Sequence, residues 1–418
     1  MVELRTPVSD RTRTEGSDCA AVDVTVHDDF DRMESLREEW DRFVETTCGD
    51  IFQTFDWCRI WWKHYGGRRR LRVLIFREKA KIIAVIPLFL DAIWVGPFRV
   101  VTAKLVGSDF GLVQYSPAIE KERMGEVARR LSEQLSLLHV DLAHIGPIAG
   151  LYGGFQEWRD ALGSGVRHYR VKTRDGGVQT YFEFDGDFDA YLSSLSKDER
   201  KHIRQSYKSV ASIPDVGPSP VVCQVVPEED LHESFSAFVD MHQAHWQDAG
   251  RSGHFGDWPA SAEFHREVAE VQQGVGRLRL MRIAAENATL GYEYVYRCGC
   301  TYFALLVARR DSPKSGGNSL GRVIFCEQVK QALGEGVRHI DSMRGRYEHK
   351  LKLGGRLYPI RSIVLVSTAR YASFKAHLYL AMSKWINLLY YKLWYCRILP
   401  RLKVKNRSLW RTWIRTRL

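Results

Sequence analysis

Two stretches of similar sequence decide the fold: RLRVLIFREKAKIIAVIPLFL at residues 70–90 and RLRLMRIAAENATLGYEYVYR at residues 277–297. They align without gaps at an offset of 207 residues. In each stretch, β-branched or aromatic residues flank a short polar turn, which is the pattern of a β-hairpin. The repetition predicts that the chain holds two copies of one fold. Chance similarity between two strands is the alternative.

The segments around the two hairpins support the same prediction. Amphipathic helical patterns precede each hairpin, at 36–44 and 54–64 in the first half and at 231–247 and 262–272 in the second. The second half then predicts a strand at 300–309, a Ser/Gly/Asn-rich loop at 312–319, a helix at 320–333, and strands at 337–343 and 360–367. This order of strand, loop, helix and strand indicates a crossover unit in a mixed sheet.

A basic helix is predicted between the two halves. Ser196 is a candidate N-cap, and Glu199 follows three residues later, as in a capping box. The helix should run to about Val210, before the prolines at 214–218 interrupt the pattern.

Composition limits the classes of protein that fit. The 418 residues carry a net charge of +11, yet 16 of the 61 Lys and Arg residues follow Glu348, after which there is no acidic residue. The basic character therefore belongs to the C-terminal tail, and no nucleic-acid-binding module is recognisable. Residues 1–20 contain no apolar core of signal-peptide length, so we expect a disordered N-terminus and a cytoplasmic protein.

The eight cysteines are scattered, and only Cys298 and Cys300 are close together. A zinc site usually needs four ligands in two such pairs, so we expect no metal. Free thiols in a reducing compartment fit this spacing better.

Six short motifs follow one another between residues 30 and 367. They are Phe52-Gln53-Thr54-Phe55-Asp56-Trp57 with Trp61, Ile86-Pro87-Leu88, Gly107-Ser108-Asp109-Phe110, Leu195-Ser196-Lys197 with Arg200 and Arg204, Met241-His242 with Trp246 and Gly250, and Asp341 with Gly345 and Lys350. This ordered set resembles the CelD-like and Fem-type group of the GNAT acyltransferase superfamily. The chain departs from that pattern at His349, where Tyr is usual, at Tyr347, and at Gly317-Asn318, where Pro-Gly is usual.

The resemblance implies an α/β (α+β) fold of two tandem GNAT-like domains, each a mixed β-sheet flanked by helices, followed by a basic helical tail. The expected parts are a disordered N-terminus at 1–20, a first domain at 21–190, a linking basic helix at 191–217, a second domain with the donor site at 218–368, and the tail at 369–418.

The second domain is expected to bind the donor, an acyl-CoA such as acetyl-CoA. The pyrophosphate of such a donor suits the free backbone N–H groups at the start of a helix. The expected donor-binding residues are Gly316, Gly317, Asn318, Ser319, Leu320 and Gly321. The glycines allow close approach of the backbone, and Asn318 and Ser319 can cap the helix. An ordinary surface loop with a helix cap is the alternative.

Acyl transfer to an amine needs a neutral nucleophile, a group that takes its proton, and donors for the developing oxyanion. The candidates for catalysis are His242, Glu293, Asp341 and Tyr347, and those for acceptor binding are Asp109, Trp246 and Lys350. Glu293 is expected to share a strand face with Gly291 and Val295. The structural alternatives are packing on Trp246 for His242, a solvated face for Glu293, a turn cap for Asp341, an Asx-turn for Asp109 and solvation for Lys350.

The tail, residues 371–418, has no run of 18 apolar residues that would span a membrane. An apolar helical stripe is predicted at Leu378, Met382, Trp385, Leu389 and Leu393, and Trp410 and Trp413 lie among arginines. We expect the tail to bind an anionic membrane surface, as basic and aromatic residues together favour. The alternatives are a helix docked on the domain and binding to RNA.

The predicted function is transfer of an acyl group, most simply acetyl, from acyl-CoA to an amine or hydroxyl of a saccharide or cell-envelope precursor. The resemblance, not the residue spacing, supplies this acceptor class. A Fem-type aminoacyl transferase that uses charged tRNA is the first alternative, and a non-catalytic GNAT-like scaffold at the membrane is the second. The expected location is the cytoplasm, with possible peripheral attachment to the inner face of the plasma membrane.

Overall fold

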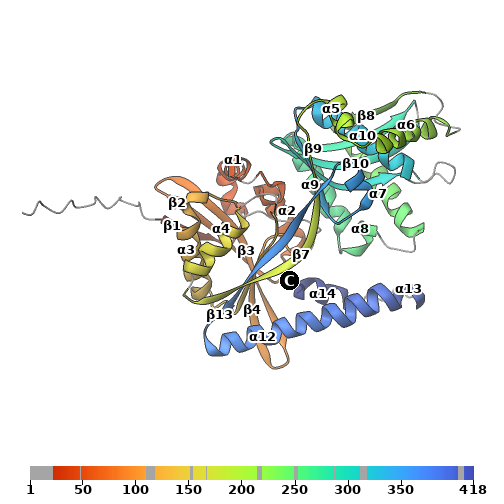
Figure 1. The fold of residues 1–418 in the computed structure, drawn as a ribbon. Coiled ribbons are helices and arrows are strands. Elements are labelled where there is room, and N and C mark those ends of the chain that lie inside the picture. Colours follow the sequence, from red (N-terminus) through yellow and green to blue (C-terminus); the bar gives the residue numbers. More distant parts are fainter. Residues whose placement is uncertain are drawn as a thin grey trace, which may run out of the picture.

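A computed structural model describes residues 22–47, 49–109, 118–150, 154–165, 167–213, 219–248, 253–286, 288–310, 318–402 and 409–418. The predicted disorder of residues 1–20 lies outside these residues. The first half, drawn in red to yellow in Figure 1, consists of β1 (Val22–His27), α1 (Arg37–Thr47), α2 (Phe55–Tyr65), β2 (Arg70–Glu78), β3 (Lys81–Val95), β4 (Phe98–Leu105), β5 (Ala118–Ile119), α3 (Met124–Leu137), β6 (Leu142–Ala149), α4 (Phe155–Gly165) and β7 (Tyr169–Glu183).

The second half repeats this arrangement. Its elements are α5 (Phe188–Ser194), α6 (Lys197–Ala211), β8 (Val221–Val225), α7 (Leu231–Asp248), α8 (Gly253–Asp257), α9 (Ser261–Gly274), β9 (Leu278–Ala285), β10 (Ala288–Cys298), β11 (Thr301–Arg309), α10 (Asn318–Gly334), β12 (His339–Arg344), α11 (Glu348–Lys352) and β13 (Arg356–Ser367). The predicted basic helix is α6, where the Ser196 hydroxyl accepts a hydrogen bond from the backbone N–H of Glu199 at 3.2 Å.

The two hairpins are equivalent, as the sequence offset predicts. Glu78 pairs with Lys81 across the first turn, and Ala285 pairs with Ala288 across the second, 207 residues later. The register also shifts at the same place in both hairpins: two residues after the turn, Ile83 in β3 and Leu290 in β10 have no cross-strand partner in the hairpin. Five strands then run in the same order and directions in each half, β1-β2-β3-β4-β6 and β8-β9-β10-β11-β12, with the last pair parallel. The predicted duplication is confirmed.

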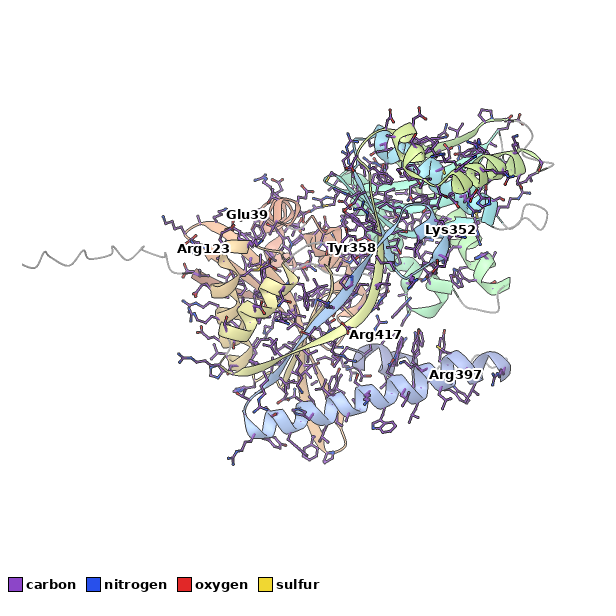
Figure 2. The ribbon with its side chains drawn as sticks, in the orientation of Figure 1. Glu39, Arg123, Lys352, Tyr358, Arg397 and Arg417 are labelled. Carbon is purple, nitrogen blue, oxygen red and sulfur yellow. The ribbon has the colours of Figure 1, made fainter. Side chains whose placement is uncertain are left out.

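Two long strands join the halves into one sheet of thirteen described strands. β13 pairs with β6 of the first half, and β7 pairs with β12 of the second half. β7 and β13 also pair with each other from Arg356 opposite Tyr181 to Ser367 opposite Tyr169. Each half therefore completes its sheet with a strand from the other half, and Tyr358 marks the crossing in Figure 2. The predicted domain boundaries at 190 and 218 stay a prediction, because β7 and β13 serve both sheets.

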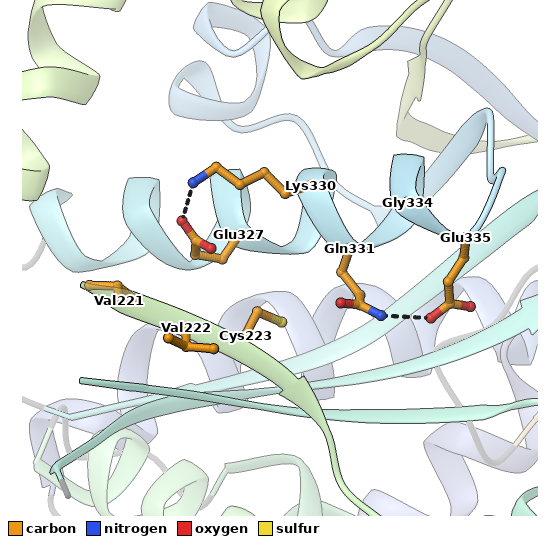
Figure 3. A pocket seen from close by; sticks show the side chains of 8 residues that line it. All are labelled: Val221, Val222, Cys223, Glu327, Lys330, Gln331, Gly334 and Glu335. Atoms are coloured by element: carbon orange, nitrogen blue, oxygen red, sulfur yellow. Dashed lines mark hydrogen bonds and ion pairs between the residues drawn. The ribbon is translucent and has the colours of Figure 1, made fainter. Parts of the chain in front are cut away.

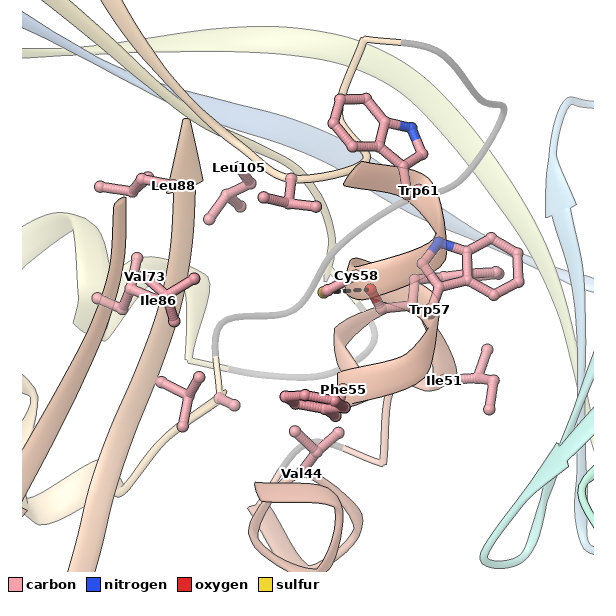
Figure 4. Packing of buried hydrophobic residues seen from close by; sticks show 14 of the residues in the cluster. Val44, Ile51, Phe55, Trp57, Cys58, Trp61, Val73, Ile86, Leu88 and Leu105 are labelled. Carbon is pink, nitrogen blue, oxygen red and sulfur yellow. Dashed lines mark hydrogen bonds between the residues drawn. The ribbon is translucent and has the colours of Figure 1, made fainter. Parts of the chain in front are cut away.

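Aromatic side chains extend the core from one half into the other. Figure 4 shows α2 packed against β2 and β3, with Phe55, Trp57 and Trp61 among the buried residues. The Trp57 ring lies 5.7 Å from the rings of both Phe264 and Tyr296 in the second half, between centroids. Contacts of this kind bury large apolar areas, so the two halves share one apolar core.

The tail docks on the sheet with one face. It forms α12 (Arg370–Trp385), a π-helical segment η6 (Ile386–Ile398), α13 (Leu399–Leu402) and, after a return of the chain, α14 (Trp410–Thr416). Helix α12 covers β3, β4 and β13, and Figure 1 shows the tail helix continuing below the second half. Trp410 and Trp413 are buried in an aromatic cluster with Tyr390. These two rings therefore do not face outward, which corrects the expectation that they belong to an exposed surface.

Candidate active site

The carboxyl ends of β11 and β12 diverge in the second half. These parallel strands pair only at residues 301–303 and 339–341, and α10 connects them. Such an opening at the carboxyl ends of parallel strands is a common place for a ligand. The predicted loop residues Gly316 and Gly317 lie outside the described residues. Asn318 begins α10, Ser319 is half-buried, and Leu320 is buried in the core.

Glu293 on β10 is a buried carboxyl group. Tyr292 and Tyr294 contact Phe238 of α7, so strand alternation directs Glu293 to the opposite face, beneath α10. A Cβ added at Gly291 on that face would meet Ile324 of α10. Burial raises the pKa of Glu293 to about 8, while the charge of Lys350 opposes this shift. The carboxyl group is therefore poised to exchange a proton near neutral pH.

Lys350 on α11 turns its ammonium group into the same site. Its Nζ donates a hydrogen bond to the carbonyl oxygen of Ser342 at 2.9 Å and lies 5.0 Å from the centre of the Tyr347 ring. Burial lowers the pKa of Lys350 to about 8, and the charges of Glu293 and Asp341 act in the opposite direction. A lysine with such a pKa can hold or release a proton in the physiological range.

Asp341 at the end of β12 is held by two donors. Its carboxylate accepts hydrogen bonds from the side-chain amide of Gln179 on β7 and from the backbone N–H of Met343 at 2.9 Å. Met343 has a φ of 59°, a left-handed conformation that costs energy in a residue with a side chain. The Asp341 bond stabilises this bend, which turns the chain toward Tyr347 and Lys350. The bond to Met343 fits the predicted turn-cap alternative, and Gln179 is a site residue that the sequence did not indicate.

Two arginines lie near the first turn of α10: Arg309, and Arg322, which pairs with Glu199 at 2.6 Å. The pKa of His349 is lowered by loss of solvation and by the charges of Lys350, Arg309 and Arg322. A Cβ added at Gly321, in the first turn of α10, would lie 3.2 Å from a guanidinium nitrogen of Arg309. Cations next to a helix N-terminus are suited to a phosphate or diphosphate group. The residues of this region therefore fit the phosphate-bearing part of an acyl-CoA.

His242 lies on the other side of the sheet, in a group of aromatic rings. Its Nδ1 lies 2.9 Å from the carbonyl oxygen of Val307, so this nitrogen donates, and Nε2 accepts from His254 Nδ1 at 2.9 Å. Burial lowers the pKa of His242 to about 4, so the ring is neutral at pH 7. Trp246 lies 6.2 Å from this ring and on the same helix face, as predicted. Val307, which accepts the hydrogen bond from His242, is the β11 partner of Glu293, so His242 reaches the same part of the sheet from its other face.

Asp109 is buried in the first half, next to the tail. It accepts a hydrogen bond from Arg69 at 2.6 Å, and its backbone carbonyl accepts one from Arg417 at 3.0 Å. Lys104 nearby donates to the carbonyl oxygens of Arg415 and Arg417, and burial lowers its pKa to about 8. Asp109 therefore belongs to a group that holds the end of the chain, and its contacts give no link to Lys350.

A pocket on the outer side of the second half is a less suitable site (Figure 3). It lies between β8 and the last turns of α10, away from the start of that helix. Glu327 in this pocket pairs with Lys330 at 2.6 Å, and Glu335 pairs with Arg279 at 2.9 Å. Its charged groups already neutralise one another. In the described residues there is also no group of His, Cys, Asp and Glu side chains arranged to hold a metal ion.

Comparison with known proteins gives one match to a protein family, and it covers most of the second half. Residues 197–351, which include Glu293, Asp341 and Lys350, match a family model described as an acetyltransferase (GNAT) domain. No curated protein sequence matches the chain.

Among solved structures, the crystal structure of FemX is 12% identical, covers 78% of this chain and 95% of its own, and has a TM-score of 0.54. A protein of unknown function from Bacteroides thetaiotaomicron is 10% identical, with 80% and 97% coverage and a TM-score of 0.50. A tandem GNAT protein from the clavulanic acid biosynthesis pathway is 12% identical, with 83% and 98% coverage and a TM-score of 0.42.

Residues 197–351 therefore match a GNAT domain, and the fold of the chain is similar to that of FemX. None of the described helices has the length and apolar character needed to cross a membrane.

Proposed function

We propose that this protein transfers an acyl group from acyl-CoA to an amine or hydroxyl acceptor, with Glu293 and Lys350 as the proton-handling pair. The observation that carries this proposal is the buried group of Glu293, Lys350 and Asp341, whose charges act on one another beside the diverging strands β11 and β12. Three elements, β10, β12 and α11, bring these groups together. Buried titratable groups with strongly shifted pKa values next to a charged partner favour a catalytic site.

Acyl-CoA would supply the activated acyl group, with its phosphates near Arg309 and Arg322. The acceptor loses a proton as its nitrogen or oxygen forms a bond to the acyl carbon and the bond from that carbon to sulfur breaks. Glu293 in its ionised form, or Lys350 in its neutral form, takes this proton. Asp341 acts as a positioning residue, because it supports the bend before Lys350 and adds negative charge near the ammonium group.

Calorimetric titration with acetyl-CoA tests the donor site. Gly321→Glu would place a carboxylate in the first turn of α10, against Arg309, where it repels a phosphate. Gly334→Glu places the same side chain at the other end of α10, where an added Cβ meets nothing within 4 Å. We expect binding by the wild type and by Gly334→Glu, and at least about tenfold weaker binding by Gly321→Glu. Equal binding by all three proteins would reject this donor site.

Aminoacyl transfer from charged tRNA is the second candidate. The positive charges at the start of α10 suit this donor as well, since they can contact any phosphate. Titration with aminoacyl-tRNA separates the two functions, because only the true donor should bind in a way that Gly321→Glu weakens. Binding of neither donor would leave the non-catalytic scaffold.

The acceptor and the location are part of the proposal. A saccharide or cell-envelope precursor is supported by the ordered motifs between residues 30 and 367. Peripheral attachment to the inner face of the plasma membrane would bring the enzyme to an acceptor located there.

A further inference from the structure

The tail helix has a fixed orientation on the sheet. Tyr379 of α12 is fully buried, and its hydroxyl donates to the carbonyl oxygen of Thr416 at 3.3 Å. Lys375 pairs with Asp141 at 2.7 Å, and Arg415 of α14 pairs with Asp91 at 2.7 Å. These contacts fix the inner face of the helix, and so they also define which residues face outward.

The outward residues form one continuous stripe, which we call the outer stripe. Its members are exposed and recur in neighbouring pairs every four residues: Lys384 and Trp385, Leu388 and Leu389, Lys392 and Leu393, and then Arg397. Trp385 is 58% exposed and Leu389 is 52% exposed. The four-residue repeat continues through η6. A π-helix has a wider turn than an α-helix, because each hydrogen bond spans five residues instead of four. Figure 2 labels Arg397 on this part of the helix.

Along the outer stripe, the cations Lys384, Lys392 and Arg397 alternate with exposed apolar side chains, and the turn with Leu388 and Leu389 is wholly apolar. No Asp or Glu follows Glu348 in the sequence, so the helix adds no negative charge of its own. Lysine and arginine can lay their aliphatic stems on an apolar surface while their charged ends reach phosphate groups. Leucine and tryptophan can enter the region between headgroups and acyl chains. This combination complements an anionic bilayer surface better than an acidic protein, which would leave the leucines in contact with water.

A second exposed aromatic group lies at the start of the same helix. Phe98, at the turn between β3 and β4, contacts Phe374 and Tyr371 of α12 with ring centroids 5.3 and 6.4 Å apart. Tyr371 is 64% exposed, and Trp94 on the same hairpin is 65% exposed. Figure 1 shows this hairpin projecting beside α12. It provides a further contact for a flat surface.

From these observations we infer that the outer stripe docks the protein on a membrane surface rich in anionic lipid, without spanning it. This inference deepens the location given in the proposed function by naming the surface that attaches, and it does not rest on the proposed catalysis, because none of the stripe residues belongs to the group around Glu293.

The test is sedimentation of the full chain with vesicles of phosphatidylcholine alone or mixed with phosphatidylglycerol. A charge variant, Lys384→Glu/Lys392→Glu/Arg397→Glu, and an apolar variant, Trp385→Ser/Leu389→Ser/Leu393→Ser, change exposed side chains only. The matched control is Lys201→Glu/Arg204→Glu/Lys208→Glu, which makes the same change of charge on exposed positions of α6. Gel filtration and thermal unfolding of each variant accompany the binding assay.

We expect the wild type and the control to bind the mixed vesicles, and both stripe variants to bind at least about tenfold more weakly. Raising the salt from about 0.1 M to about 1 M should weaken wild-type binding, because the screening length falls from about 10 Å to about 3 Å. Equal binding to neutral vesicles, equal loss in the control, or wild-type binding by either stripe variant would overturn the inference. A dimer of the wild type that both stripe variants dissociate would also overturn it, since a second copy would then cover the stripe.

Discussion

The shifted pKa values of Glu293 and Lys350 come from their tertiary surroundings and not from their neighbours in the sequence. The alternation of β10 predicts that Glu293 shares a face with Gly291, and the contact of that face with α10 agrees. Whether the face was buried could not be predicted, because burial depends on α10, which follows later in the chain. The interaction with Lys350 could not be predicted either, since the bend at Met343 that precedes Lys350 depends on tertiary contacts.

The raised pKa of Glu293 has a consequence for stability. In the folded protein the pKa of this carboxyl is about 8, whereas its ordinary pKa, which applies to the unfolded chain, is 4.5. Between these values the folded state binds more protons, so the free energy of unfolding should fall as pH rises from 5 to 8. The pKa of Lys350 is lowered from its ordinary value of 10.5 to about 8, so its contribution to the pH dependence of stability lies above pH 8.

We therefore predict that Glu293→Gln removes a fall of up to about 1.4 kcal/mol per pH unit between pH 5 and 8. Chemical denaturation at several pH values measures this slope. Glu270→Gln, an exposed change on α9, is the control and should keep the wild-type slope. A Glu293→Gln protein whose slope equals that of the wild type would mean that Glu293 is ionised in the folded state.

At the scale of elements, the hairpins were predictable and the exchanged strands were not. A hairpin is a local structure, and the gapless offset of 207 residues carries both its turn and its register shift. β13 was predicted as a strand, but its sequence does not predict that it pairs with β6 of the other half. That pairing depends on the arrangement of the whole sheet.

The two hairpin turns each have a strained residue at the equivalent position, which gives a second prediction. Lys79 and Glu286 have left-handed φ values of 56° and 50°, which glycine adopts without steric cost. Lys79→Gly should therefore raise the free energy of unfolding by about 0.5–1 kcal/mol. Lys201→Gly, in the middle of α6, should instead lower it by about 1 kcal/mol. Urea titrations of both variants check this; a destabilised Lys79→Gly protein would contradict the turn geometry.

At the scale of the whole molecule, the tail is an integral part of the first half. The sequence predicted a helix with one apolar stripe through Trp385, Leu389 and Leu393, but these residues face outward. The inner face uses Ala376, Tyr379 and Tyr390 instead, because the sheet and α14 contact that side. A pattern of apolar residues marks the side of a helix that avoids water, but it does not tell whether protein or another surface covers it.

Tyr379→Ala should therefore destabilise the whole protein by about 3–5 kcal/mol, the cost of removing a large buried aromatic side chain. Tyr371→Ala, one of the most exposed changes on the same helix, should alter stability by less than about 0.5 kcal/mol. Thermal and chemical unfolding distinguish the two. If both variants were as stable as the wild type, the docking of α12 would be wrong.

The central claim is that the second half binds the acyl donor and the first half does not. In the first half the parallel pair β4 and β6 has Lys104 at its carboxyl end, and this lysine already binds the carbonyl oxygens of Arg415 and Arg417. The equivalent end of β11 and β12 carries Asp341, Lys350 and the start of α10.

A crystal structure of the full chain grown with coenzyme A tests this claim most directly. We predict one molecule per chain, with its phosphates at the first turn of α10 near Arg309 and its thiol end toward Glu293 and Lys350. Coenzyme A bound between β4 and β6 of the first half, or in the pocket between β8 and α10, would contradict it.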